Sequence, residues 1–423
     1  MNVSRNPGVL RRNPAFRRVW TAATVGSAGG QVTLVAVPLL AAIGLHASPA
    51  VLGYLAAAGS IPYLLLALPV GVWVDRSTHP RRLVVRCDLT SAATLAVIPA
   101  AAAAAVVSLP LLAAVAFAAG VTRVITTTAS ARVVPAVLPP TDRLAGSARM
   151  NTSFAAAQIG GPAVGALLVH ALTAPYAVTV DAVSFLASAW AMHGVPEVPP
   201  TRPLQPRVSV LGDLSDGITT LTRDRTLRAL TAAAAIFNVA LSGLLTLAVL
   251  VVLHTLRLPA GAYGLTLLVV GVGALVGATA VGPVGTRFGL GPTAIAAGTV
   301  AAVGMAGWAG AADPSTAARV AVGVGSFLLG AGAVAEFVCA ETLLQLLVPD
   351  TLRGRVAATD SFFVQGARPV GALLGGFLGG ALGLHPTLLV LTAIAALSPL
   401  LLLASPLRHR ESGSQRHAGQ ADR

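Results

Sequence analysis

The chain has 423 residues, of which 55% are hydrophobic and 10% charged, and its formal net charge is +13. A soluble protein carries about a quarter charged residues, and 28 basic with 15 acidic side chains cannot coat the several domains that this length would form. The composition excludes the water-soluble classes and indicates a membrane protein. All the basic residues are arginines, which excludes a Walker A loop because that loop needs a lysine.

Twelve apolar runs are long enough to cross a bilayer, which takes about 20 helical residues. They span residues 19–44, 50–74, 83–106, 110–133, 150–171, 174–194, 229–253, 261–284, 292–312, 318–342, 360–382 and 385–405. The first run is longer than a signal-peptide core of about 7–15 residues, so we expect it to be retained. The predicted fold class is an all-α membrane protein with twelve transmembrane helices.

A proline-rich polar segment, residues 195–228, separates the spans into two groups of six. Its second part predicts an amphipathic helix on the inner membrane face, from the helical spacing of Leu211, Leu214, Ile218 and Leu221. The expected organisation is a cytoplasmic tail (1–18), a six-helix bundle (19–194), this linker, a second bundle (229–405) and a second cytoplasmic tail (406–423).

Two short motifs repeat at about half the chain length. Residues 71–76 recur as 282–287, an offset of 211 (282 minus 71), and residues 165–168 recur as 371–374, an offset of 206 (371 minus 165). The repeats predict two duplicated parallel halves.

The arginines indicate the orientation. With both termini inside, 24 lie on the inner side, two lie in outer loops (Arg257 and Arg319), and two fall within spans (Arg123 and Arg368). Because positive residues concentrate on the cytoplasmic side, we expect a multi-pass protein of the bacterial inner membrane with both termini cytoplasmic. Nucleic-acid binding would need a basic face with groove-entering elements, which the sequence lacks.

The segment 71–82 resembles the loop between spans two and three of the major facilitator superfamily of secondary transporters. The matching residues are Gly71, Asp75, Arg76, Arg81 and Arg82, whereas Thr78 replaces the second glycine. Weaker motifs resemble the exporters typified by enterobactin export and macrolide efflux proteins, and they lie at 13–17, 134–144, 158–162, 181–185 and 348–356. The resemblance implies export of a small amphipathic molecule, of the drug, secondary-metabolite or siderophore type, by alternating access with proton antiport.

Asp75 lies at the inner mouth of the second span, where a carboxylate can bind nearby arginines and a helix end only while the inner side is closed. This predicts a gate latch. In the second copy of the loop, Arg287 is retained but Thr286 replaces the acid, so the latch would be one-sided. The alternative is a solvated loop acid worth under about 1 kcal/mol.

Charges at membrane depth are costly unless paired or hydrated, so they are candidates for function. Glu336 is the candidate proton carrier, and Arg123 is a candidate counter-charge or anion-binding group. Further candidates are Arg368, Asp181 and Asp360, and Asp88 also lies within a span. The alternative for each is a static contact that holds helices together.

Polar uncharged side chains occur in the spans that the resemblance places around a central cavity. The candidates for ligand contact are Gln31, Thr126, Asn238 and Ser242, and helix-to-helix hydrogen bonding is the alternative for each. The histidines share no metal-ligand spacing, and no nucleophile–base pairing is visible. We therefore expect no metal, no cofactor and no enzymatic activity, and a monomeric protein with a small-molecule substrate.

Two other functions remain open from the sequence. One is uptake of a solute by symport. The other is a membrane sensor or scaffold that does not transport.

Overall fold

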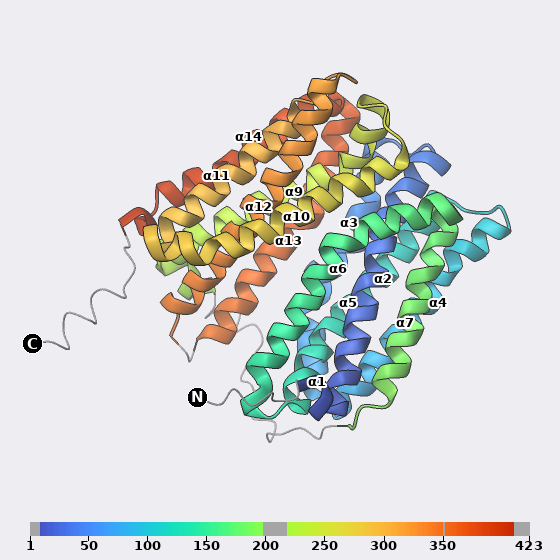
Figure 1. Ribbon diagram of the computed structural model, residues 1–423, viewed down its shortest axis with the longest axis vertical. Coiled ribbons are helices and arrows are strands. Elements are labelled where there is room, and N and C mark those ends of the chain that lie inside the picture. Colours follow the sequence, from blue (N-terminus) through green and yellow to red (C-terminus); the bar gives the residue numbers. More distant parts are fainter. Residues whose placement is uncertain (1–8, 198–217, 350–351, 410–423) are drawn as a thin grey trace, which may run out of the picture. The chain divides into compact units, whose positions relative to one another are not determined.

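The computed structural model describes residues 9–197, 218–349 and 352–409, and within them every long element is a helix (Figure 1). After the short α1 (Val9–Arg12), six long helices form the first half: α2 (Pro14–Leu39), α3 (Pro49–Arg76), α4 (Pro80–Ala103), α5 (Leu109–Val137), α6 (Arg143–Leu172) and α7 (Ala174–His193). The second half has α9 (Arg225–Leu250), α10 (Ala260–Phe288), α11 (Leu290–Ala309), α12 (Thr316–Leu347), α13 (Arg353–Leu382) and α14 (Leu384–Leu403).

Each of the twelve predicted spans lies on one of these long helices, which confirms the all-α membrane fold class. Several helices extend further at their predicted inner ends. For example, α6 begins at Arg143 and α13 at Arg353, seven residues before the predicted 150 and 360. Ten of the helices are long and apolar enough to cross a membrane; α7 and α13 are the two others, and each carries a charged side chain, Asp181 and Arg368, within its apolar run.

Side-chain caps set several helix starts. Asn13 accepts a hydrogen bond from the Phe16 amide (2.9 Å) ahead of α2, and Asp224 accepts one from the Thr226 amide (2.7 Å) ahead of α9. Both helices end in a five-residue π-helical segment, Leu40–Gly44 and Val251–Thr255. These segments lie 211 residues apart, which supports the duplication.

The chain divides into two compact units, one of Met1–His46 with Ala58–Arg207 and one of Ala47–Ala57 with Val208–Arg423. The first turns of α3 belong to the second unit because they pack closely on α13. A Cβ on Gly53 would lie 2.8 Å from the Gly376 Cα, so the two backbones meet at a distance that only glycine allows.

The predicted match of residues 165–168 with 371–374 is shifted by one helical turn. Gly165 approaches the Cα of Val32 in α2, and Gly375 approaches the Cα of Gly243 in α9, with built Cβ distances of 3.1 and 2.6 Å. Because Gly243 lies 211 residues after Val32, the counterpart of Gly165 is Gly375. The predicted partner, Gly371, lies one helical turn away, since glycine recurs every four residues in α13 and the short motif matched at the wrong turn.

The predicted amphipathic helix of the linker lies partly outside the described residues. Residues 218–223 are helical. There Leu221 is 3% exposed and packs with Leu227, Val348 and Val356.

Candidate functional site

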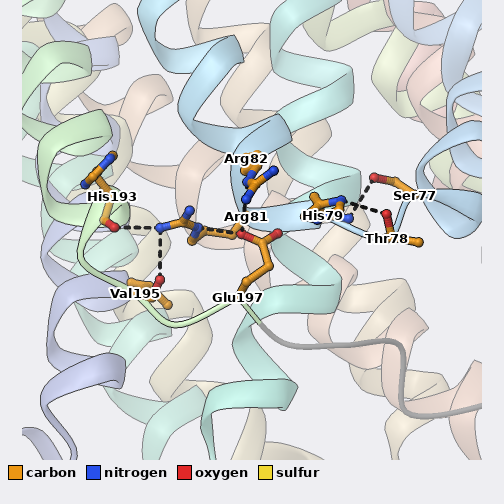
Figure 2. Close-up of polar contacts among 8 residues, drawn as sticks. All are labelled: Ser77, Thr78, His79, Arg81, Arg82, His193, Val195 and Glu197. Atoms are coloured by element: carbon orange, nitrogen blue, oxygen red, sulfur yellow. Dashed lines mark hydrogen bonds and ion pairs between the residues drawn. The ribbon is translucent and has the colours of Figure 1, made fainter.

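An arginine at the start of α4, directly after the loop that follows α3, binds the end of α7 and the chain behind it. Figure 2 shows Arg81 reaching the end of α7: its Nε lies 2.7 Å from Oε2 of Glu197, and its Nη1 donates to the carbonyl oxygens of His193 (2.6 Å) and Val195 (3.1 Å). Arg82 lies further from the same carboxylate, at 3.9 Å. These contacts join α4 to the chain that follows α7 within the first bundle.

Glu197 was not among the predicted site residues, because it stands among the linker prolines and is typical there of a solvated acid. Its side chain is only 23% exposed. The sequence did hold one signal for Glu197. This acid directly follows the sixth span, on the side where the arginine-rich loops need an opposite charge.

A second residue that the sequence did not single out is Arg132, near the inner end of α5. It donates to the carbonyl oxygens of Val74 and Ser77 (3.1 Å for the latter), at the last turn of α3. The last carbonyls of a helix have no partner within the helix, so Arg132 caps α3 with a charge that also complements the helix dipole.

The predicted latch itself is only partly described. The side chain of Asp75 lies outside the described part of the structure, so its role stays a prediction. Gly71 leaves open space where a Cβ would lie, Arg76 is exposed at the end of α3, and the Arg287 guanidinium lies over the Phe288 ring at 5.2 Å.

Two buried acids occupy equivalent places in the two bundles. Ser188 of α7 donates to Asp88 of α4 (Oγ–Oδ2 2.7 Å), and Ser398 of α14 donates to Glu336 of α12 (Oγ–Oε1 2.5 Å). The two serines correspond, because α7 and α14 begin and end 210 residues apart. Asp88 is 2% exposed and Glu336 6% exposed.

The helix that supplies the acid differs between the halves. The residue 210 positions after Asp88 is Gly298 of α11, where a Cβ would lie 3.2 Å from the Glu336 Cδ. Glu336 therefore fills the space that a side chain at Gly298 would need. The residue 210 positions before Glu336 is Thr126 of α5, which hydrogen-bonds the Cys87 thiol. The acid thus comes from α4 in the first bundle and from α12 in the second.

Glu336 faces α11 and α14 of its own bundle and is nearly enclosed there, whereas the sequence placed it in a span expected to line a cavity. Its second oxygen, Oε2, is buried without a hydrogen-bond partner among the described residues. An ionised carboxylate with an unsatisfied oxygen is costly in such a place.

The other two candidate acids also accept from threonine hydroxyls. Thr33 of α2 donates to Asp181 of α7, and Thr231 of α9 donates to Asp360 of α13, both at 2.5 Å. Asp181 is 2% exposed. Both acids therefore join neighbouring helices of one bundle.

Three of the predicted candidates meet where α9 packs on α13. Arg368 Nε lies 3.4 Å from Oδ1 of Asn238, and the Ser242 hydroxyl donates to the Arg368 carbonyl oxygen (2.8 Å). Arg123, in contrast, is an exposed residue of α5 in the first unit, and Gln31 packs against Gly161 of α6.

No group of three or more His, Cys, Asp and Glu side chains that could hold a metal ion occurs among residues 9–197, 218–349 and 352–409.

Comparisons with known proteins agree with this architecture. A family model described as transmembrane secretion effector matches residues 9–421. No curated protein matches the chain.

Solved structures with the same fold are those of transporters. A bacterial homologue of the iron transporter ferroportin in the inward-facing state has a TM-score of 0.74 at 16% identity, covering 95% of this chain and 100% of that one. A bacterial homologue of the human lysosomal transporter Spinster has 0.71 at 13%, covering 97% and 100%, and the nucleoside transporter NupG has 0.71 at 12%, covering 92% and 98%. At these identities the likeness concerns the fold alone.

Proposed function

Because the chain belongs to the transmembrane secretion effector family of the major facilitator superfamily, and is therefore a multi-pass secondary transporter and not an enzyme, we propose that it exports small amphipathic molecules in exchange for protons. The proposed substrates are of the drug, secondary-metabolite or siderophore type. The proposed working form is a monomer in the bacterial inner membrane.

The observation that carries the export direction is the family match over residues 9–421. Coupling to protons is supported by three buried acids within the spans, Asp88, Asp181 and Glu336, each bonded to a hydroxyl and each at most 6% exposed. Glu336 is the preferred carrier because one of its oxygens has no partner among the described residues. Protonation removes the cost of that unsatisfied oxygen.

Transport by the full chain in inverted membrane vesicles with an imposed pH gradient tests the proposal. The panel contains anionic, neutral and cationic amphipathic compounds, and vesicles without the protein are the control. Gradient-dependent accumulation inside the inverted vesicles is the expected result. Accumulation only in right-side-out vesicles would instead support uptake by symport, and movement of no compound would support a sensor or scaffold.

We expect both termini to be cytoplasmic, because 24 arginines lie on one predicted side and two on the other. Reporter fusions at the C-terminus and in the connection just before Leu109, between α4 and α5, should therefore read opposite sides of the membrane. A C-terminal reporter that reads the periplasm would overturn this orientation.

Asp75→Asn is expected to slow export while substrate affinity stays at the parental value, because the change removes a gate contact and no cavity contact. The measurements are the substrate Kd and the export rate at matched protein abundance. Asp313→Asn is the matched control, since it neutralises an acid in the loop between α11 and α12. A parental export rate in Asp75→Asn would rule out the latch.

A further inference from the structure

Two arginines near the start of α4 lie on a helix face that is otherwise apolar. Exposed side chains recur every three or four residues along this face, and they are Arg82, Arg86, Leu89, Ala93 and Val97. The opposite face of α4 is buried within the first bundle. From Leu89 to the end of α4, no exposed residue is charged.

The neighbouring helix α7 continues this apolar face. The helices α4 and α7 pack side by side (Figure 1). On α7 the side chains of Val183, Leu186 and Trp190 follow the same spacing and are 55%, 49% and 83% exposed. In a multi-pass membrane protein, an exposed apolar face that runs along two spans packs against lipid hydrocarbon.

Trp190 marks the depth at which this face meets the lipid headgroups. Ser188 of α7 donates to Asp88 of α4, and Arg81 binds the end of α7, so the two helices run antiparallel. Arg86 lies two residues before Asp88, and Trp190 lies two residues after Ser188. Arg86 and Trp190 are therefore at the same level. Because tryptophan is enriched at the membrane–water interface, the arginines of this face lie where lipid phosphates are found.

The two guanidinium groups are available to such a phosphate. Glu197 lies 2.7 Å from Nε of Arg81 but 3.9 Å from Nε of Arg82, whose side chain is 57% exposed (Figure 2). The Arg86 side chain is exposed and has no hydrogen-bonding or acidic partner among the residues that the structure describes. Residues four apart on a helix are neighbours, with about 5–6 Å between their Cβ atoms. Both guanidinium groups can therefore reach one phosphate and form charge-assisted hydrogen bonds with it.

The second bundle contains the equivalent helix pair without these charges. Its helices α11 and α14 begin 210 residues after α4 and α7. Pro292 and Ala296 thus take the places of Arg82 and Arg86. The arginine pair is therefore not needed to build this part of the fold.

We propose that Arg82 and Arg86 bind the phosphate of an anionic phospholipid, whose headgroup lies beside Trp190 and whose acyl chains lie along Leu89 and Val97. The occupant is a lipid because the arginines continue an apolar face that a dissolved anion would not cover. A headgroup such as phosphatidylglycerol is favoured over phosphatidylcholine, since the choline cation would meet two arginines. This site requires that the chain spans a membrane and does not depend on which molecule the chain transports.

Quenching of tryptophan fluorescence in reconstituted vesicles tests the site. The full-length protein is placed in vesicles of dioleoyl phosphatidylcholine, in which rising fractions are replaced by a dibrominated phosphatidylglycerol or by a dibrominated phosphatidylcholine with the same chains. Bromine quenches the tryptophans that lie next to it. The binding constant of phosphatidylglycerol should exceed that of phosphatidylcholine about fivefold or more, because each arginine near the membrane surface attracts an anionic lipid by about this factor.

The joint variant Arg82→Gln with Arg86→Gln should bring the ratio of the two binding constants to about one, and each single variant should give an intermediate ratio. Lysine at both positions keeps the charge and should retain part of the preference. Trp190→Phe should remove the excess quenching by phosphatidylglycerol, because the reporter beside the headgroup is lost. Arg17→Gln, which neutralises an exposed arginine at the start of α2, should leave the ratio unchanged.

The inference is overturned if the two brominated lipids quench the parental protein equally, or if the excess quenching persists in the joint glutamine variant or in Trp190→Phe. It is also overturned if Arg17→Gln lowers the ratio as much as the joint variant does, because the attraction would then belong to the whole basic side of the protein. Quenching by brominated phosphatidylcholine at the parental level shows that a variant is correctly inserted. If the joint variant fails this check, the single variants and Trp190→Phe decide.

Discussion

Glu336→Gln is expected to lower proton-driven export by about a factor of ten or more, with normal abundance of the protein in the membrane. Glutamine has the same shape, so it keeps the packing against Gly298 and can still accept from Ser398. It cannot gain or lose a proton, and its amide group occupies the place of Oε2, the oxygen without a partner among the described residues. The variant therefore resembles the protonated state permanently.

The measurements are export into inverted vesicles with a pH gradient, exchange without a gradient, and the pH dependence of substrate affinity. Exchange and binding should survive, and the pH dependence should flatten, because one linked proton is lost. Asp88→Asn is the matched variant, since it neutralises the acid at the equivalent place in the first bundle, and it should keep most of the export rate.

Export of Glu336→Gln at the parental rate, with unchanged pH dependence, would transfer the proton role to Asp181 or Asp360 or would mean another coupling ion. Failure of the variant to accumulate in the membrane would instead identify Glu336 as an acid that pairs helices. Normal abundance with lost coupling is the result that supports the proposal.

Gly330→Ala is expected to destabilise the second bundle by about 3 kcal/mol. A Cβ on Gly330 of α12 would lie 1.9 Å from the Val270 carbonyl oxygen and 3.0 Å from the Ala274 amide nitrogen of α10. Both of these atoms belong to a helix backbone, which cannot turn aside as a flexible side chain can. The two helices would have to separate along a seam that small residues hold together.

Gly323→Ala on the same helix is the matched control, because no atom lies within 4 Å of a Cβ built there. Alanine replaces glycine within a helix at a gain of about 0.5–1 kcal/mol, so this variant should be as stable as the parent or more so. The measurement is the fraction of monodisperse protein in detergent after heating, read by size exclusion. Equal heat resistance of the two variants would show that α10 and α12 are not packed as described.

The number, order and approximate limits of the long helices followed from the sequence alone. The length of an apolar run can be read from the local sequence. Because the bilayer has a fixed thickness, that length alone indicates whether the run forms a membrane-spanning helix. The starts of helices such as α2 and α9 depend on one capping side chain within a few residues. They are therefore also determined by the local sequence. The loop motif at 71–82 and the order of weaker motifs identified the family for the same reason.

The partners of the polar side chains depended on the tertiary structure. Ser398 and Glu336 are 62 residues apart, Arg132 and Val74 are 58 apart, and Arg368 and Asn238 are 130 apart. Which face of a helix meets which neighbour is decided by packing between helices. In a helix that is apolar on all sides, the spacing of hydrophobic residues does not indicate which face packs against a neighbour.

The repeat shows the same limit. Four matching residues aligned Gly165 with Gly371 as its counterpart in the repeat, but the contacts of these helices with α2 and α9 align Gly165 with Gly375. Likewise, the sequence gives no sign that Glu336 on one helix takes the place of an acid on another, because Gly298 and Glu336 meet only when α11 packs on α12. Which residues of the two halves are equivalent is decided by how closely the helix backbones pack. That packing exists only in the folded bundle.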